Sequence, residues 1–144
     1  MMLGSADEWS AWVGPVPPAA AEVGRRFWPG PLTLALPALP HVDARLTVDG
    51  TVGVRVPGES LALEVARAYG RALTGTSANL SGEPPARTSD ELSAALRCRA
   101  ELLVLPGAAP GGAPSTIATY ELGTQRLRVQ REGAIPTTEL AAWL

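Results

Sequence analysis

Hydrophobic and polar positions along the chain follow two different periods, and these periods predict helices interleaved with strands. Helical spacing of apolar residues predicts five helices, at residues 6–13, 18–28, 59–69, 88–96 and 137–144. In the third, apolar positions from Leu61 to Tyr69 share one helix face, and Gly70 is the predicted end. The fourth is predicted to begin at an N-cap formed by Thr88 or Ser89.

Short apolar runs bounded by glycine, proline or aspartate predict strands between these helices. They lie at residues 32–36, 52–56, 71–74 and 102–105, followed by a hairpin of 116–121 with 125–129. The run at 102–105 contains only apolar residues, which favours a buried strand, and the glycine- and proline-rich segment 106–114 is predicted to be a loop. Strands that alternate with helices predict one α/β domain over residues 1–144.

Composition narrows the class of protein. The chain has 144 residues, of which 46% are hydrophobic and 18% charged, as in globular domains. One cysteine and one histidine exclude a Cys/His zinc cluster, and no apolar run is long enough to span a membrane. Because residues 1–7 lack a basic region followed by an apolar stretch, the expected compartment is the cytoplasm.

The charged residues exclude some kinds of chemistry and favour particular ligands. The formal net charge of −2 argues against a protein that mainly grips nucleic-acid backbones. All 12 basic residues are arginine, so chemistry that needs a lysine Schiff base or a P-loop lysine is excluded. Arginine offers a planar fork of donors that suits carboxylates and phosphates.

Polar segments at the ends of predicted strands are candidates for a binding site. Alternation within 53–57 places Val54 and Val56 on one face and Arg55 on the other, where it faces either water or a cleft. The segment 76–82 combines hydroxyls, the Asn79 amide and small residues, which suits either an anion-binding nest or a capped turn. Segments 111–116 and 131–133 add hydroxyls and Arg131. If they converge on one cleft, they favour an anionic ligand such as a nucleotide.

Read in order, these segments resemble the motifs of the YrdC/TsaC family. The similar stretches are WPGPLT at 28–33, GVRVP at 53–57, SANLSG at 77–82, PSTI at 114–117 and REGAI at 131–135. Five motifs in the family's order cover most of the chain. The resemblance implies a YrdC-like α/β fold, in which a twisted mixed sheet with flanking helices presents a concave ligand face.

The resemblance also implies an activity, namely synthesis of threonylcarbamoyl-AMP and pyrophosphate from L-threonine, bicarbonate and ATP. By the family's pattern, the ATP-binding residues would be Thr51, Ser77, Asn79, Pro85 and Arg131. The threonine-binding residues would be Arg55, Gly75 and Ser115. Mg²⁺ would accompany ATP as a substrate, and the partner would be the complex that transfers the threonylcarbamoyl group to tRNA.

The family's pattern begins with a strand of the type PTxTxYGLG and a KxR element, which resemble nothing in residues 1–5. The sequence is therefore expected to be N-terminally incomplete, either through a late start or as a short form that has lost the reaction. The alternative function is a non-catalytic module that binds a nucleotide or RNA. An open sheet edge would also favour self-association, for example as a homodimer.

Overall fold

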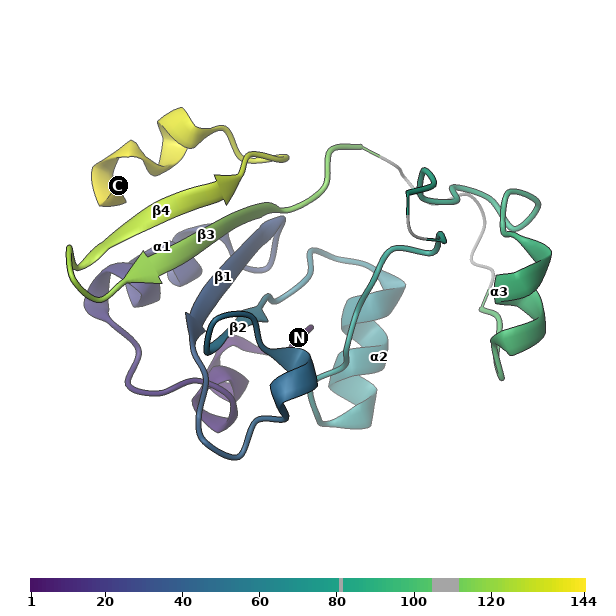
Figure 1. Ribbon diagram of the computed structural model, residues 1–144, viewed down its shortest axis with the longest axis horizontal. Coiled ribbons are helices and arrows are strands. Elements are labelled where there is room, and N and C mark those ends of the chain that lie inside the picture. The colour runs from purple at the N-terminus through teal and green to yellow at the C-terminus, as the bar shows by residue number, and fades with distance from the viewer. Residues whose placement is uncertain (81, 105–111) are drawn as a thin grey trace. The chain divides into compact units, whose positions relative to one another are not determined.

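The computed structural model describes residues 1–80, 82–104 and 112–144, which fall into two compact units. Residues 1–74 and 113–144 form what we call the sheet unit, and residues 75–112 form the second unit. The chain thus leaves the sheet unit after Thr74 and re-enters it at Ala113 (Figure 1). Each unit is described by itself.

The sheet unit contains a four-stranded mixed sheet in the order β2-β1-β3-β4. Its strands are β1 (Leu32–Pro37), β2 (Thr51–Val54), β3 (Thr116–Glu121) and β4 (Arg126–Arg131). β1 is parallel to β3, and the pairs β1–β2 and β3–β4 are antiparallel. The predicted hairpin and the predicted strands at 32–36 and 52–56 are confirmed, with ends shifted by at most two residues. Together with the flanking helices, the sheet confirms the predicted α/β class.

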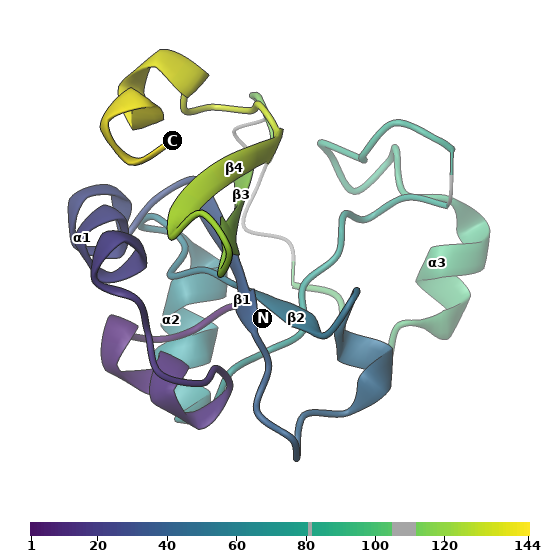
Figure 2. The ribbon, with the colours of Figure 1, turned by 60° about the vertical axis from the view of Figure 1, so that its left-hand side comes forward.

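Helices pack on one side of this sheet (Figure 2). α1 (Pro18–Phe27) lies against β1 and β4, and its first residue is a proline, whose missing N–H costs nothing at that position. α2 (Leu61–Tyr69) is capped by the Ser60 hydroxyl and ends at Gly70, whose φ of 69° is the left-handed conformation that glycine adopts freely. The predicted helices at 18–28 and 59–69 are therefore confirmed.

The first and last predicted helices are short 3₁₀ helices, η1 (Ala6–Ala11) and η3 (Thr137–Trp143). The predicted strand at 71–74 is a single bridge, because only Leu73 pairs, with Met2. Met2 also bridges Arg55 in the parallel direction, so the first residues of the chain lie between segments 53–55 and 73. Within the described ranges, no helix is long and apolar enough to cross a membrane.

Alternate residues of the strands form the core. Leu32, Leu34 and Leu36 of β1 are buried on the face that the helices cover, beside Val52 and Val54 of β2. Each such side chain contributes about 1.5–3 kcal/mol relative to full exposure. The other face of the sheet therefore carries the remaining, more polar positions, and it is here that the candidate site lies.

The second unit contains α3 (Ala94–Arg99), whose position differs from the predicted helix at 88–96. Ser93, rather than Thr88 or Ser89, is the N-cap and accepts a hydrogen bond from Leu96 N. The Glu91 carboxylate instead accepts a hydrogen bond from Arg87 N, which keeps the preceding segment in turns. The sequence pattern placed the helix too early because several residues there could serve as a cap.

The prediction of a buried strand at 102–105 is wrong for its described part. Leu102 and Val104 are 77% and 53% exposed and have no regular secondary structure. A short apolar run predicts burial, but it carries no information about the surface that would cover it. Leu105 and the first part of the predicted loop, residues 106–111, lie outside the described residues.

Candidate functional site

A cavity of about 390 Å³ opens on the face of the sheet opposite the core. All four strands line it with side chains that alternate with the buried core residues. The strand residues of the lining are Thr33, Ala35, Thr51, Gly53, Ile117, Thr119, Arg128 and Gln130, and a loop adds Leu46, Val48 and Asp49. Its volume falls in the range of about 300–1,000 Å³ that is typical of small-molecule sites.

Small residues on β1 and β2 make this hollow. Register places Gly53, Ala35, Thr119 and Arg128 side by side in one row across the sheet. A Cβ atom at Gly53 would come within 3.3 Å of Thr33 Cγ2, so glycine both widens the cavity and avoids crowding. The small side chains at positions 35 and 53 therefore leave the space that forms the cavity.

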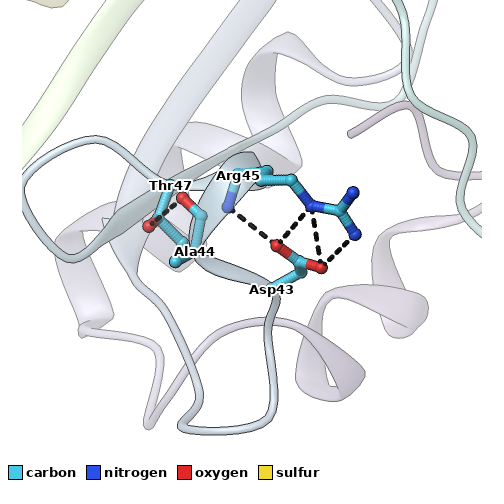
Figure 3. A network of polar contacts seen from close by, with 4 residues as sticks. All are labelled: Asp43, Ala44, Arg45 and Thr47. Carbon is cyan, nitrogen blue, oxygen red and sulfur yellow. Dashed lines mark hydrogen bonds and ion pairs between the residues drawn. The ribbon is translucent and has the colours of Figure 1, made fainter.

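The loop at the rim is held by a local network (Figure 3). The Asp43 carboxylate accepts a hydrogen bond of 2.8 Å from Arg45 N and pairs with the Arg45 guanidinium at 2.6 Å. The Arg45 side chain, followed by its backbone N–H, lowers the pKa of Asp43. Thr47 donates to Ala44 O, which closes the turn η2 (Ala44–Leu46). This turn presents Leu46 and Val48 to the cavity.

Hydroxyl groups and an arginine gather at one end of the same face. Thr33 Oγ1 lies 2.9 Å from Ser115 Oγ, and Arg131 Nη2 donates to Ser115 O at 2.8 Å. Arg131 Nη2 is also 3.5 Å from Ser115 Oγ. This Thr33–Ser115–Arg131 cluster joins three of the motif segments found in the sequence. It offers two hydroxyls and a cation, a combination that suits an anionic ligand.

A β-bulge positions Arg131. Ala118 pairs with Val129 and Ile117 pairs with Arg131, so Gln130 is an extra residue in β4. A bulge turns side chains away from strict alternation. This explains why Gln130 lines the cavity while the next residue, Arg131, reaches Ser115, which directly precedes β3.

The buried Thr116 hydroxyl fixes the segment that follows β4. It accepts hydrogen bonds from Gly133 N and Ile135 N at 2.9 and 3.0 Å and donates to Ile135 O at 2.6 Å. At Gly133 a Cβ atom would lie only 2.1 Å from Pro114 O, so the close approach of the two segments requires glycine. The REGAI and PSTI stretches are thus locked together.

Arg55 lies on the same side of its segment as Gly53, opposite the buried Val54 and Val56. The side chain is half-buried, and its Nε donates to Gly30 O at 2.9 Å. Burial lowers the pKa of the Arg55 guanidinium from its ordinary value. Within the described ranges Arg55 belongs to no ion pair, so its terminal N–H groups are available to a carboxylate or a phosphate.

The structure distributes the predicted site residues over both units. Thr51 lines the cavity, and Arg55, Ser115 and Arg131 lie in the sheet unit. The second unit holds Gly75, Ser77, Asn79 and Pro85.

Asn79 organises its own loop. Its Nδ2 donates to Leu80 O and Glu83 O, both at 2.9 Å, while Oδ1 has no hydrogen-bond partner among residues 1–80, 82–104 and 112–144. Ser77 O accepts a hydrogen bond from Asn79 N, and Ser77 and Pro85 are exposed. The Asn79 side chain therefore ties together the backbone at Leu80 and Glu83, and its Oδ1 is buried and unpaired among the described residues.

Sequence reasoning missed several cavity residues, among them Asp49, Thr119, Arg128 and Gln130. Thr119 could have been predicted from alternation. Alternate residues of a strand share a face, so Thr119 follows Ile117 and Ser115, and Ser115 was already a candidate. For Gln130 no signal existed, because it lies one residue beyond the predicted strand of 125–129, whereas β4 extends to Arg131.

This fold is shared with proteins of a known family. A model of the Sua5/YciO/YrdC family, described as "telomere recombination", matches residues 1–133. The chain belongs to this family. Among solved structures, Pyrococcus abyssi Sua5 in complex with L-threonine superposes with a TM-score of 0.87 at 28% identity, covering 99% of this chain and 42% of that one. E. coli YciO superposes with a TM-score of 0.82 at 25% identity, covering 96% and 67%.

Relatives with a named activity are proteins called threonylcarbamoyl-AMP synthase. The one from Alkalilimnicola ehrlichii is 38% identical over 118 residues, or 79% of this chain, and the one from Bacillus subtilis is 37% identical over 72% of it. The P. abyssi synthase is 32% identical over 87%. The chain spans 61% of the A. ehrlichii protein and about a third of the other two, 31% and 36%.

Proposed function

We propose that this chain acts in the synthesis of threonylcarbamoyl-AMP from L-threonine, bicarbonate and ATP, with release of pyrophosphate. The observation that carries the proposal is the Thr33–Ser115–Arg131 cluster at one end of the cavity face. Arg55 lies on the same side of its segment as the cavity-lining Gly53. Relatives named threonylcarbamoyl-AMP synthase support it.

The terminal N–H groups of Arg55 would bind the carboxylate of L-threonine as a bidentate fork. Ser115 and Gly75 would complete the threonine site. Arg131 would bind the phosphates of ATP. Its hydrogen bond to Ser115 O orients the side chain before the ligand binds. A fixed cation avoids reorganisation when the ligand binds.

ATP would contact Thr51 in the cavity together with Ser77, Asn79 and Pro85 of the second unit. Asn79 Oδ1 is buried and has no hydrogen-bond partner among the described residues, and this supports the assignment because a buried polar group without a partner calls for one.

The protein's task in this reaction is mostly positioning. An oxygen of the threonine carbamate attacks the α-phosphorus of ATP, the bond to the bridging oxygen breaks, and pyrophosphate leaves. Negative charge builds on the phosphate oxygens in the transition state, where Arg131 would stabilise it. Holding the two reactants together converts a bimolecular step into a nearly unimolecular one.

Mg²⁺ would arrive with ATP. Among the described residues, no group of three or more His, Cys, Asp or Glu side chains could hold a metal ion. Mg²⁺ usually retains several waters and binds through phosphates and one or two carboxylates, a requirement that ATP itself largely meets. Asp49 at the cavity rim is a carboxylate that fits this role.

Further parts of the proposal concern partners. The product would pass to the complex that transfers threonylcarbamoyl groups to tRNA. Self-association as a homodimer, contact with RNA and a cytoplasmic location remain predictions from the sequence.

The direct test is threonine- and bicarbonate-dependent release of pyrophosphate from ATP by the 144-residue chain. Release that requires both co-substrates supports the proposal. A folded chain that binds neither L-threonine nor ATP in calorimetry would contradict it. Binding of ATP without turnover would favour the non-catalytic module.

A further inference from the structure

Thr33 lies within the candidate site, yet the proposed function gives it no role. β1 carries it between β2, which leads to Arg55, and β3, which directly follows Ser115. The Thr33 side chain is half-buried. Its hydroxyl contacts the hydroxyl of Ser115, a residue of the proposed threonine site. An effect of Thr33 on the ligand can therefore pass through Ser115.

Gly53 fixes the orientation of the Thr33 side chain. A Cβ atom at position 53 would lie 3.3 Å from Thr33 Cγ2, so the methyl group of Thr33 occupies space that glycine leaves on β2. The hydroxyl on the same Cβ points instead to Ser115 Oγ, 2.9 Å away. Because a β-branched side chain has few accessible χ1 rotamers, the packed methyl group keeps the hydroxyl directed at Ser115.

The direction of this hydrogen bond follows from the partners of the two hydroxyls. A hydroxyl has one proton to donate and two lone pairs that accept. Within the described part of the chain, Ser115 Oγ is the one hydrogen-bond partner of Thr33 Oγ1, so the Thr33 proton is satisfied there only if Thr33 donates. Arg131 Nη2, at 3.5 Å, is a second and weaker donor to Ser115 Oγ. The Ser115 proton is then left for a ligand.

We propose that Thr33 is a positioning residue, which orients the Ser115 hydroxyl as a donor to a carboxylate oxygen of L-threonine. The inference rests on the proposed function, because it concerns how Ser115 of the same site binds its substrate. A carboxylate only accepts hydrogen bonds. If Ser115 donated to Thr33, its oxygen rather than its proton would face the anion. Donation by Thr33 prevents this before the ligand binds, so the site needs less reorganisation.

The test measures L-threonine affinity by isothermal titration in T33V, S115A and the double variant T33V/S115A. T33V keeps the branched shape and removes the hydroxyl. We expect it to weaken L-threonine binding about three- to tenfold, as for the loss of one neutral hydrogen bond. In the S115A background the same change should weaken binding less than about twofold, because no hydroxyl is left for Thr33 to orient. T33S should recover most of the loss.

Two further variants serve as controls. T124V makes the same change at an exposed turn outside the cavity and should bind L-threonine as the unsubstituted chain does. T33A also lacks the hydroxyl and replaces T33V if the latter does not fold, which thermal unfolding shows.

The outcomes separate this inference from the proposed function. Unchanged L-threonine binding in folded T33V overturns the inference and leaves the proposed function intact. Equal weakening with and without the Ser115 hydroxyl also overturns it, because Thr33 would then act independently of Ser115. A T33S chain that binds as weakly as T33V would assign the effect to the methyl group and overturn it as well. If the folded, unsubstituted chain binds no L-threonine, the inference falls together with the threonine site.

Discussion

Thr33 and Ser115 are far apart in sequence, yet their hydroxyl oxygens lie 2.9 Å apart. The contact follows from the parallel pairing of β1 with β3, which places Leu32 beside Thr116. It joins the WPGPLT stretch to the PSTI stretch at the end of the cavity face. Neither stretch alone would make a site, and the sheet register is what combines them.

Replacing Arg55 with alanine should weaken L-threonine binding by about ten- to a hundredfold, the effect of losing charge-assisted hydrogen bonds. The fold should persist, because the Arg55 side chain makes one described hydrogen bond, to Gly30 O. Isothermal titration with L-threonine measures the first effect and thermal unfolding the second. R55K is the matched variant, which keeps the charge but loses the fork and should recover only part of the affinity. Unfolding of R55A would instead make Arg55 a structural residue.

Replacing Asn79 with alanine should weaken ATP binding and leave L-threonine binding unchanged. The Oδ1 atom of the side chain is buried without a partner among the described residues, and its Nδ2 holds the loop through Leu80 O and Glu83 O. Titration of both ligands into the same preparation provides an internal control. Unchanged ATP affinity would remove Asn79 from the site.

Replacing Thr116 with valine should destabilise the sheet unit by roughly 2–4 kcal/mol, because it leaves the buried N–H of Ile135 without its partner and also frees that of Gly133. Chemical denaturation measures the change, and T124V, at the exposed turn, is the comparison. T116S should restore most of the stability. A stability loss no larger than that of T124V would show that the hydroxyl does not lock the two segments.

The Glu132 carboxylate should titrate below its ordinary range. Its hydrogen bonds from the Thr137 hydroxyl and then from Thr137 N lower the pKa of Glu132. Since the folded pKa lies below the unfolded one, this contact stabilises η3 above the unfolded pKa. The contribution is lost as the pH falls through the folded value. A carboxyl-detected NMR titration follows the group, and E132Q should remove that part of the pH dependence. A pKa at or above the ordinary value would contradict the contact.

Local patterns predicted the elements that depend only on nearby residues. The period of α2 and its end at Gly70 are such a case, as is the hairpin of β3 and β4. The position of α3 was missed because neighbouring serines and threonines compete as caps. The exposure of Leu102 was missed because burial depends on surfaces that a short run does not specify.

The candidate site was predictable where residues carry a recognisable chemistry, as Arg55 and Ser115 do. The cavity was not, because it depends on register. Gly53 and Ala35 become neighbours only when β1 pairs with β2, and the unpartnered hydroxyl of Thr119 becomes evident only in three dimensions.

The pairing of β1 with β3 also has a kinetic consequence. The hairpin of β3 and β4 closes over a few residues, whereas Leu32 and Thr116 must meet across most of the chain. Closing a long loop costs conformational entropy before the burial of apolar surface stabilises the contact. Sheets of this topology therefore assemble slowly. The last step in acquiring the cavity should therefore be the docking of the hairpin onto β1. Until then, the sheet unit exposes an unpaired apolar strand edge that can associate with other chains.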